Sequence, residues 1–115
     1  MFVGKAQRDK GKRGEREVAE ICRDFGFPAT RTAQHCGKTA GKADVEGVPG
    51  LHLEVKRTEI LRPWDYMDQA LRDALAAGRG EMPTVVWRKN EHEWLALLRF
   101  TDLLALVKAA ESEGE

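Results

Sequence analysis

The stretch Leu51-His52-Leu53-Glu54-Val55-Lys56 alternates apolar and polar side chains without a break. Residues i and i+2 of a β-strand point to the same face. The pattern therefore predicts a strand that carries its polar side chains on one face, namely His52, Glu54 and Lys56. Half-buried strands show the same alternation toward solvent. From this stretch alone, a plain solvated face and a functional face remain alternatives.

A second acid stands shortly before this strand. The segment Ala43-Asp44-Val45 is joined to it through the turn residues Val48-Pro49-Gly50, which favour a reversal of the chain. We therefore predict a hairpin over residues 43–57, in which Asp44 can lie across from Glu54. Two carboxylates and the Lys56 ammonium would then meet in one region of a sheet.

These residue types suit magnesium-dependent phosphodiester hydrolysis. Mg²⁺ prefers oxygen ligands and needs only one or two carboxylates as protein anchors. It lowers the pKa of a bound water and offsets charge on phosphoryl oxygens. A neighbouring lysine can stabilise the negative charge that develops on phosphorus-bound oxygens.

A third acid lies in line with a helical stripe. Residues 12–26 have the spacing of an amphipathic helix, whose apolar stripe comprises Val18, Ile21, Cys22 and Phe25. One turn before Val18 the same stripe reaches Glu15, and a buried carboxylate is costly unless it is paired or metal-bound. The alternative is that Glu15 is an ordinary acid in a first helical turn.

This ordered set resembles the PD-(D/E)XK nuclease superfamily, and within it the small Holliday junction resolvases of the archaeal type and their phage-encoded relatives. The resemblance runs over about residues 11–100. It implies that Asp44, Glu54 and the backbone carbonyl of Val55 hold the metal, that Lys56 is catalytic and that Glu15 completes the site, directly or through a water molecule. Some relatives carry a glutamine on the helix after the lysine, and Gln69 corresponds to it.

Three positions depart from the family pattern or fit it poorly. Ala43 stands where the superfamily name implies proline, and the nearest candidates for a loop serine of the archaeal-type enzymes are His35 and Cys36. A helical wheel places Gln69 away from the expected buried stripe of its helix, which comprises Trp64, Met67, Leu71, Ala74 and Leu75.

The resemblance implies a Mg²⁺-dependent, structure-selective DNA endonuclease, with Mn²⁺ able to substitute, that acts on four-way junctions in recombination and repair. It also implies a homodimer, because a junction needs two symmetric cuts. The alternatives are a replication-repair nuclease of the VRR type, a nicking enzyme on other DNA, a catalytically inactive DNA-binding relative, and a domain that binds only proteins.

Charge is balanced overall but unevenly distributed. The chain has 19 basic and 19 acidic residues, whereas by our count from the sequence residues 1–42 contain about twice as many basic as acidic ones. A basic segment beside a metal site is typical of phosphate contacts. We expect these residues to contact DNA: Lys10, Lys12, Arg13, Arg16, Arg31, Lys38, Lys42 and Arg57.

Several other classes of function are disfavoured. Gly37-Lys38-Thr39 lacks the earlier glycine of a phosphate-binding loop, so no nucleotide cofactor is expected. Cys22 and Cys36 lack metal-site spacing. The sequence has neither a signal peptide nor an apolar run of membrane-spanning length. These features predict a cytoplasmic protein without a membrane partner.

The whole pattern predicts one α/β domain over residues 12–110, a restriction-endonuclease-like mixed sheet flanked by helices in the order α-β-β-β-α-β-β-α. Residues 1–11 are expected to be a basic flexible arm and residues 111–115 an acidic tail. The expected later elements are a helix over 63–77, strands over 82–88 and 94–99, and a helix over 102–110 capped by Thr101. A short strand is expected over 29–33.

Overall fold

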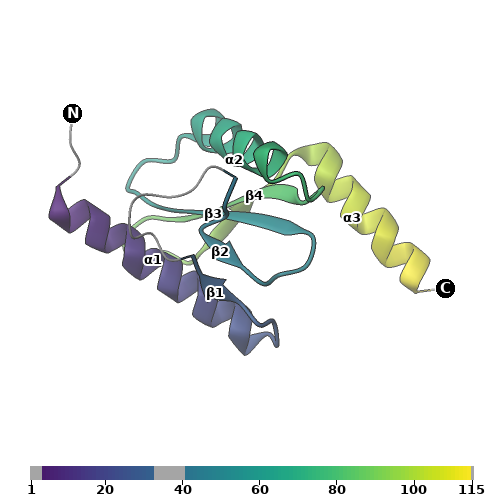
Figure 1. Cartoon of the computed structure of the whole chain (residues 1–115), viewed down its shortest axis with the longest axis horizontal. Helices are drawn as coiled ribbons and strands as arrows, with labels where there is room; N and C mark the ends of the chain where they lie inside the picture. The colour runs from purple at the N-terminus through teal and green to yellow at the C-terminus, as the bar shows by residue number, and fades with distance from the viewer. Residues whose placement is uncertain (1–3, 33–40, 115) are drawn as a thin grey trace.

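The computed structural model describes residues 4–32 and 41–114. Eight elements follow one another along the chain (Figure 1): α1 Lys5–Asp24, β1 Thr30–Arg31, β2 Val45–Glu46, β3 Leu51–Arg57, α2 Pro63–Ala77, β4 Met82–Arg88, β5 Leu95–Leu97 and α3 Phe100–Glu113. This is the predicted order, and the bounds of α2 and β4 agree with those expected from the sequence. None of the helices described is long and apolar enough to cross a membrane.

The strands form one mixed sheet in the order β1-β2-β3-β4-β5. β1, β2 and β3 pair antiparallel, as does β5 with β4. β3 and β4 are parallel over their full lengths, from Leu51 beside Met82 to Arg57 beside Arg88. A parallel pair needs a crossover connection, and α2 supplies it.

α1 and α2 cover opposite faces of this sheet (Figure 1). On one face, Val18 and Ala19 of α1 pack against apolar side chains of the first three strands and their connection, namely Ala29, Val45, Leu53 and Val55. On the other face, Tyr66 and Ala70 of α2 pack against Val85 of β4. The apolar half of the β3 alternation therefore faces α1, and its polar half faces α2.

The buried face of α2 differs from the predicted stripe. Trp64 and Leu75 are 78% and 72% exposed, whereas the buried positions are Tyr66, Ala70 and Ala74. Two alanines one turn apart let the helix lie close to the sheet. The Tyr66 hydroxyl lies 2.8 Å from that of Thr58 and donates to the Ile60 carbonyl at 3.2 Å, which satisfies the polar end of this ring.

Both terminal helices are longer than predicted. α1 begins at Lys5, so the segment expected to be an arm continues the helix; the Gln7 side chain accepts from the Gly4 amide and Lys5 pairs with Asp9. α3 begins at Phe100 after an Arg99 N-cap, and Thr101 is not its cap. Arg99 instead pairs with Asp102 in the first turn at 2.8 Å. Residues 111–113 of the expected tail belong to α3.

Among the glycines of residues 4–32 and 41–114, Gly47, in the turn between β2 and β3, is the least able to accept a side chain. Its φ is +107°, and a Cβ there would lie 2.8 Å from the Pro28 carbonyl carbon and 2.9 Å from the Ala29 Cα. We expect Gly47→Ala to lower the free energy of unfolding by about 3 kcal/mol in denaturant titrations, from backbone strain and this collision.

Gly50→Ala is the matched control for this variant. Gly50 also has a positive φ, +80°, but nothing lies within 4 Å of the added carbon. Its cost should be the backbone term alone, about 1 kcal/mol. Equal destabilisation by the two variants would contradict the close approach of Gly47 to Pro28 and Ala29.

Candidate active site

The polar face of β3 is buried beneath α2 and is not a solvated strand face. His52 and Glu54 are 1% and 0% exposed, and His52 Nε2 lies 3.1 Å from Glu54 Oε1. A fully buried carboxylate is costly without a compensating partner. This burial favours the functional alternative for the alternation of residues 51–56.

The hairpin brings Asp44 to this place. Val45 pairs with Leu53 in an antiparallel register, so Asp44 stands opposite Glu54, as predicted. The Asp44 amide donates to the Leu53 carbonyl at 2.9 Å, and Asp44 Oδ2 accepts from the Val55 amide at 2.9 Å. These two hydrogen bonds anchor a buried aspartate at the edge of β3.

Lys56 is held by α2. Its Nζ donates to Gln69 Oε1 at 2.7 Å and lies 5.3 Å from the centre of the Tyr66 ring, within the range of a cation–π contact. The helical wheel placed Gln69 away from the core because it assumed the wrong buried stripe. With Tyr66 and Ala70 buried, Gln69 lies over the sheet and orients the lysine.

Glu15 and Arg31 form an ion pair between α1 and β1, with Arg31 Nε 2.7 Å from Glu15 Oε1. Both side chains are largely buried, and because α1 begins at Lys5, Glu15 lies in the middle of the helix and is not an acid of its first turn. Its part in a metal site stays a prediction. Arg31, expected to contact DNA, has its guanidinium engaged by Glu15.

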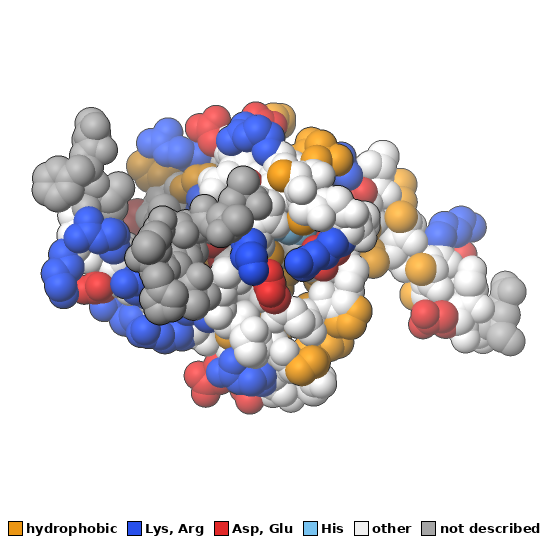
Figure 2. All heavy atoms as spheres, in the orientation of Figure 1, with side chains coloured by type: hydrophobic (Ala, Val, Ile, Leu, Met, Phe, Trp, Pro, Cys, Tyr) orange, Lys and Arg blue, Asp and Glu red, His pale blue; other side chains and the backbone are white. Residues whose placement is uncertain are grey.

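The other basic residues expected at DNA lie mostly on α1. Lysine and arginine side chains gather over its N-terminal half (Figure 2). Their field acts on Asp9, whose pKa is held below its ordinary value by the hydrogen bond from Lys5 and, less strongly, by the charges of Lys12 and Arg13.

The remaining expected DNA contacts differ in environment. Lys42 is exposed, Lys10 lies 3.7 Å from Glu59, and Arg57 donates to the Asn90 side chain at 2.7 Å. Lys38, His35 and Cys36 lie outside the described residues. DNA contacts thus stay a prediction, with exposed Lys12, Arg13 and Arg16 the best placed.

Two polar residues beside Glu54, His52 and Asp73, had no predicted role in the site. His52 had been placed on the correct face of β3, and Asp73 follows Gln69 by four residues on α2, one turn along the same helix face. One ligand-type atom from each of His52, Glu54 and Asp73 lies within 4.8 Å of the others. The four-residue spacing of Gln69 and Asp73 could have indicated that both side chains face β3. That inference required knowing which face of α2 is buried.

The donor chemistry fits a divalent cation. Asp44, directly before β2, and Glu54 of β3 are both buried and stand opposite each other. Two carboxylates with neighbouring solvent and substrate oxygens are the usual anchors for Mg²⁺. The arrangement therefore places carboxylate oxygens that can bind a cation beside β2 and β3. The Lys56 ammonium lies two residues beyond Glu54 along β3.

Comparisons with known proteins were made at the level of sequence and of structure. No protein-family model and no curated protein matches the sequence. Among solved structures, Hjc, a Holliday junction resolvase of the archaeal hyperthermophile Archaeoglobus fulgidus, matches with a TM-score of 0.59 and 24% sequence identity over 76% of each chain. The element order and mixed sheet agree with the expectation from the sequence. The chain thus shares the fold of this archaeal resolvase structure.

Proposed function

We propose that this chain is a divalent-metal-dependent endonuclease that cleaves branched DNA, with the four-way junction as its substrate and recombination or repair as its setting. The observation that carries the proposal is the antiparallel register that sets buried Asp44 opposite buried Glu54, with Lys56 held two residues further along β3. The shared fold with a junction resolvase supports the choice of substrate.

Each residue has a distinct part in this proposal. Asp44, Glu54 and the Val55 carbonyl would hold Mg²⁺, or Mn²⁺ in its place, with Glu15 at the periphery. The cation would supply a water of lowered pKa and charge compensation at the phosphate. Lys56 would donate to a phosphoryl oxygen as negative charge builds up there, and Gln69 would keep its ammonium in position.

A cleavage panel tests the proposal. The wild-type chain is incubated with a four-way junction, a flap and a linear duplex, each with Mg²⁺, with Mn²⁺ and with excess chelator. We expect paired cuts in the junction that require a divalent ion, and slow or no cutting of linear duplex. Preferential cutting of the flap or duplex would instead favour a VRR-type or nicking nuclease. Binding without cleavage on every DNA would favour an inactive relative.

We expect the basic surface of α1 to contribute to DNA binding and not to the cleavage step. We expect the double variant Lys12→Ala, Arg16→Ala to weaken junction binding and to reduce the slope of log affinity against log salt by about 2, because two phosphate contacts are lost. Fluorescence anisotropy over a salt series measures this. Lys108→Ala, a cation on α3 paired with Glu111, is the control and should leave the slope unchanged.

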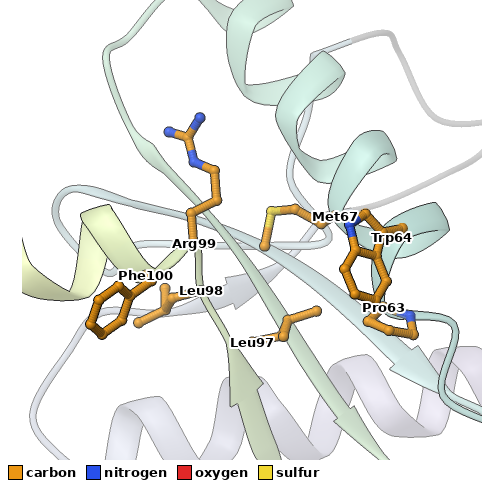
Figure 3. Close-up of a pocket in the computed structure, with 7 residues that line it drawn as sticks. All are labelled: Pro63, Trp64, Met67, Leu97, Leu98, Arg99 and Phe100. Carbon is orange, nitrogen blue, oxygen red and sulfur yellow. The ribbon is translucent and has the colours of Figure 1, made fainter.

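We further propose that the chain acts as a homodimer that joins through α3. This helix has no buried residue, and its apolar side chains Leu103, Leu104, Leu106 and Val107 are 41–51% exposed. At its N-terminal end, a pocket of about 330 Å³ separates Leu98, Arg99 and Phe100 from Trp64 and Met67 of α2 (Figure 3). Isolated helices of this length are only marginally stable in water, which supports packing against a second copy.

The oligomeric state can be tested with a helix-face variant. We expect light scattering to give twice the 12.9 kDa chain mass for the wild type and a single chain mass for Leu103→Glu, Val107→Glu. These residues are four apart and lie on one face of α3. The control Lys108→Glu should remain dimeric. A monomeric wild type, or a dimeric double variant, would contradict an α3 interface.

A further inference from the structure

We propose that His52, Glu54 and Asp73 form a second cation site, between β3 and α2, for a divalent transition ion that accepts an imidazole nitrogen. It shares Glu54 with the proposed nuclease site but uses neither Asp44 nor Lys56. The three side chains offer one nitrogen and two carboxylate donors. One donor atom of each lies within 4.8 Å of the other two.

The separations suit a common ion. His52 Nε2 and Glu54 Oε1 are 3.1 Å apart. Two ligands of one tetrahedral Zn²⁺, each about 2.1 Å from the metal, are separated by about 3.4 Å, so a shift of a few tenths of an ångström would bring this pair to that separation. His52 and Glu54 are fixed by burial, whereas Asp73 is only half-buried. Asp73 is therefore the ligand whose rotamer can adjust to close the site.

The second observation concerns the far side of the imidazole. His52 is 1% exposed, and within the described part of the chain its Nδ1 is buried without a hydrogen-bond partner. Glu81 Oε1 is 4.0 Å from Nδ1. Metal-bound histidines usually direct their second ring nitrogen to a carboxylate, which sets the tautomer and ring orientation. Glu81, just before β4, is placed for this role, and Nε2 is left facing Glu54.

The donor types indicate which ions the site would prefer. Mg²⁺ selects oxygen ligands, whereas imidazole favours Zn²⁺ and other later first-row ions. A site with one imidazole and two carboxylates should therefore bind Zn²⁺ or Co²⁺ in preference to Mg²⁺. Without such a cation, the His52–Glu54 contact would be only a buried hydrogen bond that orients Glu54.

Titration of the full chain with Co²⁺, in the absence of DNA, separates these readings because it does not depend on cleavage. Visible absorption and calorimetry are followed for the wild type, Asp73→Asn and His52→Gln. We expect one Co²⁺ per chain that Zn²⁺ displaces but equal Mg²⁺ does not, and a loss of affinity for this ion of at least about tenfold in each variant. His52→Gln should also alter the absorption band, because it removes the nitrogen ligand.

Asp44→Asn is the matched control and keeps this experiment distinct from the nuclease proposal. It should retain the Co²⁺ band and affinity. If the chain cuts no DNA but Co²⁺ binding depends on His52 and Asp73, the cation site stands and the proposed function falls. Wild-type affinity in Asp73→Asn, no Co²⁺ binding by the wild type, or loss of the band in Asp44→Asn would each overturn the cation site. Asp73→Asn, which changes a half-buried residue, decides the matter if His52→Gln does not fold.

Discussion

Asp44→Asn is expected to reduce Mg²⁺-dependent cleavage of a four-way junction by about a thousandfold or more, because cation-based charge compensation contributes several kcal/mol to the transition state. The variant removes a negative charge from the predicted metal site and leaves a side chain of nearly the same size and shape. The asparagine carbonyl can still accept from the Val55 amide, as Asp44 Oδ2 does at 2.9 Å. The fold and the basic surface of α1 should therefore persist.

Two measurements make this result specific. Junction affinity in the presence of chelator should stay within about twofold of wild type, because DNA binding rests on phosphate contacts elsewhere. Asp68→Asn, which removes one exposed carboxylate from α2, should cleave normally. If Asp44→Asn cuts junctions at the wild-type rate with Mg²⁺, the assignment of the metal site is wrong.

Lys56→Met is expected to lower the single-turnover cleavage rate by about 100- to 1000-fold, the range seen when one transition-state hydrogen-bond donor is removed. Methionine keeps an unbranched apolar stem beside Tyr66 but has no ammonium to donate. Because Lys56 is assigned to the transition state, the rate should fall while DNA affinity in chelator hardly changes.

Gln69→Ala is the companion variant for Lys56. The Lys56 ammonium remains, but its 2.7 Å contact with Gln69 is lost, so the rate should fall by only about tenfold, as for residues that orient a catalytic group. The double variant Lys56→Met, Gln69→Ala should be no slower than Lys56→Met alone. Additive losses would show that Gln69 acts independently of Lys56.

Local pattern predicted much of the fold. The β3 alternation, the turn at Val48–Gly50 and Pro63 at the start of α2 are each signals within a few residues, and the structure places strand, hairpin and helix there. The position of Asp44 opposite Glu54 could be predicted because a short connection leaves a hairpin few registers.

The sequence could not predict which face of α2 is buried. Hydrophobicity favoured Trp64 and Leu75, but the sheet instead accepts Tyr66 and two alanines, because small side chains allow close packing and Thr58 satisfies the phenol. Which face of α2 is buried decides whether the side chains of Gln69 and Asp73 reach β3. No role was predicted for His52 for the same reason, because the residue of α2 that faces it was unknown.

The sheet ends in very short strands, β1 with two residues and β5 with three. Such short edge strands expose few backbone N–H and C=O groups to which another strand could pair. This protects the protein against edge-to-edge aggregation into fibrils. We therefore expect two copies to associate through side chains rather than through a shared sheet. Any such pairing can then be tuned or abolished by surface substitutions that leave the hydrogen-bonded framework intact.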